Sequence, residues 1–301
     1  MSVNSVELMP GTLRLSRFVA GFWRQKYWKK RDSELQAYVE ELLALGVTSM
    51  DHALVYRSEQ QFGRVLKSAP SLREGMQIIS KFGIRPQGFG NLGADSVNFY
   101  DSSPEHLRAS VEQSLRDLNT DYLDLLLVHR PDFLMDARAL GEAFSDLHAS
   151  GKVRYFGVSN FSPSQFELLQ SACELTLLTN QVEFSAMHLE PLTNGVFDQC
   201  QQRALKPMLW SCLAGGELLT GKSAQATRLR NAARVLADEL GIESLQQIFY
   251  AWILALPCQP IPILGSAQIE RIRDAVAAEK LSLSREQWYS IWQASTGHRV
   301  P

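Results

Sequence analysis

Residues 103–132 read SPEHLRASVEQSLRDLNTDYLDLLLVHRPD, and they contain the pattern that decides the fold, a capped helix followed at once by an apolar strand. Ser103, Pro104 and Glu105 supply an N-cap, a proline suited to the first helical turn and an acid at the positive end of the helix dipole. Residues 125–129 then predict a strand that is apolar on both faces. Such strands are typical of a parallel sheet covered by helices.

The same alternation of strand and helix extends along the whole chain. Eight short apolar runs are expected to be strands, at residues 19–23, 48–51, 77–82, 125–129, 155–159, 178–183, 206–210 and 260–264. Eight such units predict an α/β fold, a closed (β/α)8 TIM barrel formed by a single domain over residues 1–301.

Local signals place the helix ends and two additions to the barrel. Ser33 and Gln36 have capping-box spacing, and Ser162 and Ser244 are expected to start later helices. The Pro10-Gly11 turn predicts an N-terminal hairpin, and a second box at residues 284–287 predicts an extra C-terminal helix.

Composition excludes several classes of function. Among the 301 residues, 30 Lys and Arg against 32 Asp and Glu give a net charge of -2, which provides no basic field for nucleic acid or a membrane surface. The four cysteines lack metal-site spacing, and the first residues lack a signal-peptide pattern. No apolar run has the length of a membrane span. We therefore expect a cytoplasmic protein, a monomer or weak homo-oligomer, that binds a small molecule and no metal.

Polar side chains follow the apolar strands at their carboxyl ends, where barrel enzymes carry their chemistry. Asp51, Lys81 and His129 end three successive strands, and Tyr56 lies in the loop after Asp51. Each residue alone has an ordinary structural explanation, but a buried Asp51 and Lys81 on adjacent strands are expected to pair. The ammonium is expected to lower the pKa of Tyr56, which would then act as a general acid toward a carbonyl, with His129 orienting the oxygen.

Three segments carry a resemblance to a known family. MDHALVYRSEQQFG at 50–63, the stretch at 103–132 and GKVRYFGVSNF at 151–161 resemble motifs of the aldo-keto reductase superfamily, in the bacterial oxidoreductase branch related to the potassium-channel β subunits. The resemblance implies NADPH-dependent reduction of an aldehyde or ketone. Its catalytic residues would be Asp51, Tyr56, Lys81 and His129, with Tyr56 as the proton donor.

The resemblance also implies a set of residues that hold NADP(H). The expected set is Gly21, Phe22, Trp23, Ser159, Asn160, Gln181, Trp210, Ser211, Leu213, Gly215, Gly265, Ser266, Arg271 and Asp274. Within it, Ser159, Asn160 and Gln181 would bind the nicotinamide carboxamide, and Trp210 would stack on the ring. Ser211, Leu213 and Gly215 would line the pyrophosphate and ribose.

The choice of NADP over NAD rests on ILGSAQIERIR at 263–273. By resemblance, Gly265, Ser266 and Arg271 hold the 2′-phosphate, and a helix N-terminus with a guanidinium beside it suits that anion. The sequence departs from the family's usual pattern at Arg57, where a glycine is common, and at Trp210, where a smaller aromatic is common.

A second nucleotide motif is present by spacing alone. GFGNLG at residues 88–93 matches G-x-G-x-x-G, but we reject it because it does not join a strand directly to a helix. Residues 83–102 are instead expected to form a mobile flap over the barrel mouth. The aromatic residues expected to form an apolar substrate pocket there are Trp23, Phe82, Tyr100 and Phe133.

Two other functions remain open from the residues. A regulatory or sensor subunit would bind NADP(H) tightly, turn over slowly and require a protein partner. A Schiff-base aldolase would use Lys81 as its nucleophile, but pairing with Asp51 would keep that lysine protonated.

Overall fold

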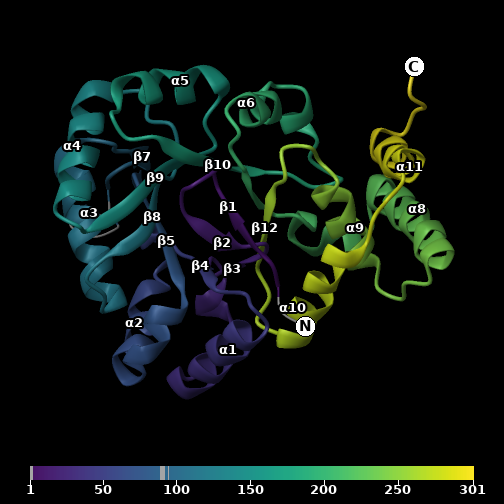
Figure 1. Cartoon of the computed structure of the whole chain (residues 1–301), viewed down its shortest axis with the longest axis horizontal. Helices are drawn as coiled ribbons and strands as arrows, with labels where there is room; N and C mark the ends of the chain where they lie inside the picture. The colour runs from purple at the N-terminus through teal and green to yellow at the C-terminus, as the bar shows by residue number, and fades with distance from the viewer. Residues whose placement is uncertain (1–2, 89–91, 94) are drawn as a thin grey trace.

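The computed structural model describes residues 3–88, 92–93 and 95–301, and its centre is a closed barrel of eight parallel strands (Figure 1). The strands are β3 (Val19–Gly21), β4 (Ser49–Asp51), β5 (Gln77–Phe82), β8 (Leu123–Val128), β9 (Val153–Ser159), β10 (Leu177–Glu183), β11 (Met208–Trp210) and β12 (Ile261–Leu264). They follow one another in chain order, and β12 pairs with β3 to close the ring. The predicted (β/α)8 fold and all eight predicted strands are confirmed.

Helices surround the barrel on its outer side (Figure 1). They are α1 (Asp32–Ala44), α2 (Glu59–Ser68), α3 (Pro104–Leu118), α4 (Ala137–Ala149), α5 (Pro163–Ala172), α6 (Val196–Gln202), α7 (Glu217–Thr220), α8 (Ala224–Leu240), α9 (Leu245–Leu254), α10 (Ile269–Ala277) and α11 (Arg285–Thr296). Short 3-10 turns lie at Gln25–Tyr27, Leu54–Tyr56, Pro70–Gly75, Glu190–Leu192, Ala214–Gly216 and Ala278–Lys280. The predicted extra C-terminal helix is α11, which packs against α8 beside the barrel.

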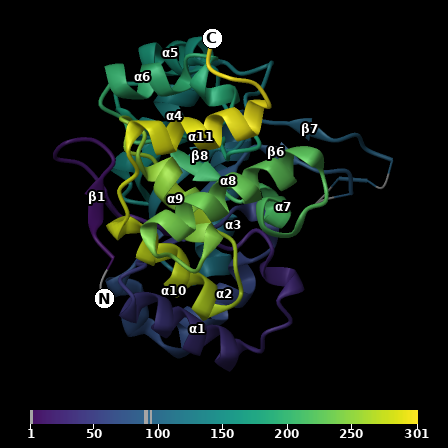
Figure 2. The same cartoon turned by 90° about the vertical axis from the view of Figure 1, so that its right-hand side faces the viewer.

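Two antiparallel hairpins accompany the barrel. The predicted N-terminal hairpin is confirmed as β1 (Ser5–Glu7) paired with β2 (Arg14–Ser16). In the predicted flap, β6 (Ile84–Arg85) pairs with β7 (Phe99–Tyr100), and this hairpin projects sideways from the molecule (Figure 2). Gly90, in the rejected glycine motif, lies outside the described residues.

The barrel strands alternate between an inner and an outer apolar layer. On β8, Leu125 and Leu127 face the same inner cluster as Leu8 and Leu15 of the N-terminal hairpin, whereas Leu126 packs with the helices. Because side chains alternate along a strand, an apolar strand fills the barrel and also anchors the helices. The hairpin thus covers the amino-terminal end of the barrel and leaves the other end for the site.

The helix caps at α3, α5 and α11 agree with the sequence signals, whereas the cap at α1 does not. The N-cap of α3 is Ser103, whose hydroxyl accepts from the His106 N–H at 3.3 Å, and the box at 284–287 is present. The predicted box at Ser33 is wrong, because α1 begins one residue before it with Arg31 as N-cap. The Glu34 carboxylate accepts from the Arg31 backbone N–H at 2.7 Å, and this earlier acceptor fixes the start of the helix.

A buried carboxyl ties three elements together close to the barrel mouth. Glu59 at the start of α2 accepts hydrogen bonds from Ser80 of β5 at 2.5 Å and from Ser114 of α3 at 3.0 Å. The residue is 1% exposed, and burial raises the pKa of its carboxyl to about 7. The folded protein therefore holds this proton at a pH at which the unfolded chain has released it.

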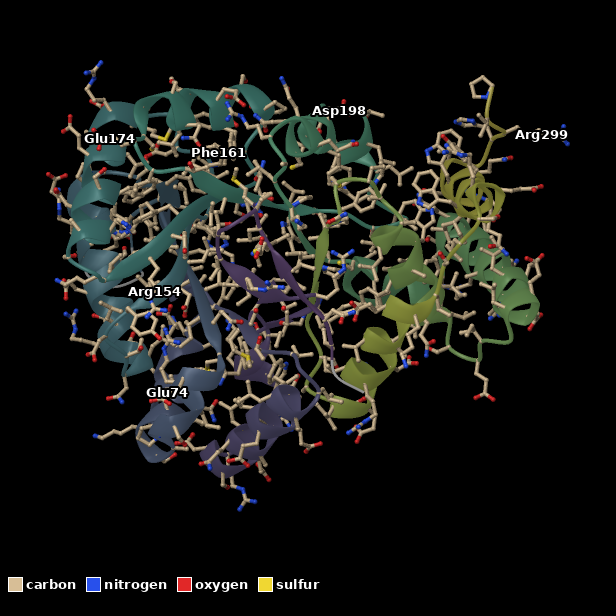
Figure 3. All side chains as sticks on the ribbon, in the orientation of Figure 1. Glu74, Arg154, Phe161, Glu174, Asp198 and Arg299 are labelled. Carbon is tan, nitrogen blue, oxygen red and sulfur yellow. The ribbon has the colours of Figure 1, made fainter. Side chains whose placement is uncertain are left out.

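We expect Glu59→Gln to change how stability depends on pH. A carboxyl with a raised folded-state pKa costs stability as the pH rises from its unfolded value of 4.5 to about 7. Relative to wild type, the free energy of unfolding of Glu59→Gln should increase by about 2 kcal/mol between pH 5 and pH 8. Urea denaturation at both pH values measures this difference. Glu74 is exposed (Figure 3), so Glu74→Gln is the control, and its free energy of unfolding relative to wild type should be the same at pH 5 and pH 8. The same lack of change in Glu59→Gln would contradict the raised pKa of Glu59.

Candidate active site

A buried ion pair lies at the carboxyl ends of β4 and β5. The Lys81 Nζ donates to Asp51 Oδ2 at 2.7 Å and to the His52 carbonyl oxygen at 2.9 Å. Lys81 is 1% exposed and Asp51 is 3% exposed, so the predicted pairing is present away from water. Burial is the largest single influence and opposes the charged ammonium, but Asp51 and Tyr56 together outweigh it and raise the pKa of Lys81. The lysine is a fixed cation.

Tyr56 lies directly against this cation. The Lys81 Nζ is 4.9 Å from the centre of the tyrosine ring, and the Tyr56 hydroxyl is 3.3 Å from His129 Nε2. Arg57 takes a left-handed backbone conformation, with φ of 58°, which ends the turn that presents the tyrosine. The glycine usual at this position would adopt that conformation without strain.

The expected direction of the Tyr56 pKa is wrong. Burial raises the pKa of the phenol, and this effect exceeds the opposing influence of the Lys81 charge. The sequence shows that a cation is near the tyrosine but not how completely the ring is removed from water. The consequence is that Tyr56 keeps its proton at neutral pH.

His129 is held in its neutral form. Burial, the Lys81 charge and the Arg130 charge together lower the pKa of the imidazole well below its usual value. Its Nε2 faces the Tyr56 hydroxyl, while its buried Nδ1 has no hydrogen-bond partner among the described residues. A neutral imidazole carries one N–H donor, which suits it to bind an uncharged oxygen.

A chain of hydrogen bonds connects the ion pair to the far wall of the mouth. Gln181 Nε2 donates to Asp51 Oδ1 at 2.9 Å, and the Ser159 hydroxyl donates to the Gln181 carbonyl oxygen at 2.7 Å. Asn160 Nδ2 donates to Ser159 Oγ at 2.8 Å, and Trp210 Nε1 donates to Asn160 Oδ1 at 3.1 Å. These contacts fix the side chains of four strands in one arrangement.

An open cleft of about 710 Å³ extends from this cluster to the start of α10. The predicted site residues that line it are Gly21, Trp23, Asp51, Tyr56, His129, Ser159, Asn160, Gln181, Trp210, Ser211, Leu213, Gly215, Gly265, Ser266 and Arg271. Lys81 lies behind the wall, with none of its side chain exposed. The structure therefore brings residues from 21 to 271 of the chain into one cavity of a size typical for ligand sites.

Two members of the predicted cofactor set do not line the described cleft. Phe22 is fully buried and stacks on His52, with ring centres 4.4 Å apart. Asp274 accepts hydrogen bonds from the side chains of Ser244, Gln246 and Gln247 at the start of α9. The Ser244 hydroxyl thus donates to Asp274 and does not cap the helix, although Ser244 does precede α9 as predicted.

The predicted apolar pocket is wrong for three of its four aromatic residues. Trp23 lines the cleft, but Phe82 is 2% exposed and packs in the outer core. Since Lys81 points into the barrel, the next side chain along β5 must point outward. Tyr100 and Phe133 are exposed, and neither lines the described cleft.

Two cations in the cleft wall are not among the predicted site residues. Arg24 and Arg130 both line it, and each directly follows a residue that had been assigned to the site, Trp23 and His129. That adjacency was the available signal. Arg24 lies beside the loop of Gly215, with its Nη2 3.4 Å from where a Cβ on that glycine would stand.

The described residues contain neither a metal-binding cluster nor a membrane-spanning helix. No group of three or more His, Cys, Asp or Glu side chains in residues 3–88, 92–93 and 95–301 is arranged to hold a metal. Within the same residues, no helix is both long enough and apolar enough to cross a membrane.

Comparison with known proteins agrees with this geometry. The model of the "Aldo/keto reductase family" matches residues 17–295. The chain belongs to the aldo/keto reductase family. It is 48% identical over 302 residues to "Oxidoreductase YdhF" of Escherichia coli (strain K12), across 99% of this chain and 100% of that protein. It is 39% identical to the "6-dehydroglucose reductase" of Agrobacterium fabrum, across 96% and 97% of the two chains.

Solved structures of this family share the fold. The crystal structure titled as the thermostable aldo-keto reductase Tm1743 with the inhibitor epalrestat matches with a TM-score of 0.81 and 23% identity, over 97% of this chain and 99% of that one. The protein is therefore an aldo/keto reductase family enzyme, an oxidoreductase, built on the family's barrel.

Proposed function

We propose that this aldo/keto reductase uses NADPH to reduce an aldehyde or ketone to an alcohol, with Tyr56 as the proton donor. The observation that carries the proposal is the contact of Tyr56 with both Lys81 and His129 at one end of the cleft. The same cleft is lined by most of the residues that the family resemblance assigns to NADP(H). The 6-dehydroglucose reductase among the relatives is named for a carbonyl reduction, which agrees with this direction.

The residues present fit a nicotinamide dinucleotide. Gly215 and Gly216 line the cleft, both have positive φ, and neither has a side chain of its own, so phosphate oxygens can approach their backbone closely. Trp210 offers an aromatic face, and Ser159, Asn160 and Gln181 offer polar groups for a carboxamide. When bound, the reduced nicotinamide supplies the hydride that the carbonyl carbon accepts.

Tyr56 supplies the matching proton. Because burial raises its pKa, the phenol is protonated before the reaction and can donate to the carbonyl oxygen as negative charge develops there. The ring centre of the phenolate that remains then lies 4.9 Å from the Lys81 ammonium. The ion pair with Asp51 holds that ammonium in place, so the transferred charge has a fixed partner.

His129 orients the carbonyl. Its ring is neutral, and its Nε2 lies next to the Tyr56 hydroxyl, so an Nε2–H tautomer donates to the same oxygen that Tyr56 protonates. Two donors, one in the turn after β4 and one directly after β8, then define the position of one oxygen, and the carbon beside it faces the cleft.

The two alternatives fit the site less well. The raised pKa of Lys81 and its bond to Asp51 keep it protonated, whereas a Schiff-base nucleophile must be neutral. A sensor subunit needs only the cofactor contacts and leaves the Tyr56–His129 contact without a role. A sensor subunit would turn over slowly and would require a protein partner, whereas the enzyme would turn over rapidly on its own.

Tyr56→Phe should abolish carbonyl reduction and leave cofactor binding intact. The variant keeps the ring against Lys81 but lacks the transferable proton, so kcat should fall by about 100-fold or more. NADPH oxidation followed at 340 nm with a panel of aldehydes measures the loss. Tyr289→Phe, on the C-terminal helix, is the matched control and should keep wild-type rates. Full activity of Tyr56→Phe would remove Tyr56 from the mechanism.

Arg271→Gln should weaken the preference for NADPH. The side chain lines the cleft at the start of α10, where it would pair with the 2′-phosphate that NADH lacks. Loss of a charged hydrogen bond predicts a fall of about 10- to 100-fold in kcat/KM for NADPH, with that for NADH changed less than about threefold. Arg273→Gln, two residues away and also exposed, is the control. An equal loss with both cofactors would contradict the 2′-phosphate role.

A further inference from the structure

Three guanidinium groups line the described cleft, and one of them lies at its catalytic end. They belong to Arg24, Arg130 and Arg271. Arg271 is at the end proposed for the 2′-phosphate, and Arg24 lies beside Gly215 in the loop proposed for the pyrophosphate. Arg130 follows His129 directly and is left without a cofactor phosphate to bind.

The position of Arg130 is defined by what it contacts. Its guanidinium carbon lies 5.7 Å from the ring centre of Trp210, and both residues line the same cleft as Tyr56. Its charge acts on both Tyr56 and His129, since it helps to lower the pKa of His129 and opposes, without reversing, the rise in the pKa of Tyr56. The cation therefore lies close enough to act on a molecule that is held between these two residues.

Arg130 has no carboxylate partner in the part of the chain that the structure describes. The side chain is half-buried, and its guanidinium lies over the Trp210 ring. The acid in the cleft wall is Asp51, whose two oxygens already accept from Lys81 and Gln181. A guanidinium has five N–H donors in a planar fork and is costly to leave unpaired where water is displaced.

A substrate would displace water from this fork. An alkyl or aryl chain offers the guanidinium no acceptor, whereas hydroxyl or carboxylate oxygens on the carbons near the carbonyl would accept from it. Sites that hydrogen-bond a substrate oxygen discriminate strongly against analogues that lack it, because the protein group is then left unpaired.

We propose that Arg130 is a specificity-determining residue that selects carbonyl substrates carrying hydroxyl or carboxylate oxygens close to the reacting carbonyl. The inference rests on the proposed reductase function and adds the class of substrate to it. Arg130 binds those oxygens, Tyr56 and His129 bind the carbonyl oxygen, and the reacting carbon is thereby placed from two sides. The arginine takes no part in the proton transfer.

The test compares Arg130→Met with wild type on two matched pairs of aldehydes. D-glyceraldehyde against propanal tests hydroxyl oxygens, and succinic semialdehyde against butanal tests a carboxylate. Methionine keeps an apolar contact for Trp210 while removing the donors. For at least one oxygenated aldehyde, kcat/KM should fall by about 10- to 100-fold, mainly through KM, and the plain aldehydes should change less than about threefold.

Comparing variants removes the difference in intrinsic reactivity between the aldehydes. Arg138→Met, an exposed arginine on α4, is the matched control and should leave all four values unchanged. Fluorescence titration of NADPH should give the same Kd for Arg130→Met and wild type. Equal losses on all four aldehydes, no loss on any, or a weakened NADPH Kd would each overturn the proposal.

A separate readout distinguishes this proposal from the reductase function. If wild type reduces none of the four aldehydes, the proposed function fails on this panel, and the Arg130 site is then tested by calorimetric titration of D-glycerate into the NADP⁺-saturated protein. Binding that Arg130→Met abolishes would support the oxygen-binding site. Absence of binding to wild type, or equal binding to both proteins, would overturn it.

Discussion

The site depends on a lysine ammonium buried inside the barrel next to a tyrosine. Removing such a charge from water costs several kcal/mol unless it is paired and hydrogen-bonded. Asp51 and the His52 carbonyl oxygen satisfy Lys81, and Gln181 satisfies the remaining oxygen of Asp51. The cation therefore has a fixed place, and Tyr56 is positioned against it. Each later feature of the mechanism uses that fixed charge.

The barrel makes this arrangement possible by bringing strand ends together. Asp51, Lys81, His129 and Gln181 are far apart in sequence but lie at the carboxyl ends of four of the eight strands. The inner apolar layer and the N-terminal hairpin fill the barrel beneath them. The barrel is closed below and carries loops above, so the polar groups face one cleft. The burial of Lys81 and Asp51 strengthens their interaction.

The sequence was sufficient for the architecture because apolar runs and helix caps are local signals. It predicted all eight strands and the ion pair, because adjacent parallel strands end at the same edge. It failed where the answer depends on packing. The sign of the Tyr56 pKa depends on how deeply the ring is buried, and the outward direction of Phe82 depends on strand parity set by Lys81. Arg130 was missed because an arginine beside a site residue is usually a solvent-exposed charge.

A double-mutant cycle in kcat/KM tests the claim that Lys81 and Asp51 act on Tyr56 as one unit. The proteins are wild type, Lys81→Met, Asp51→Asn and the double variant, assayed with NADPH and one aldehyde at pH 7. When two groups act together, the losses of transition-state free energy in the two single variants do not add. The kcat/KM of the double variant should therefore lie within about tenfold of that of the less active single variant. Losses that multiply in full would show that the two residues act independently and would contradict this account.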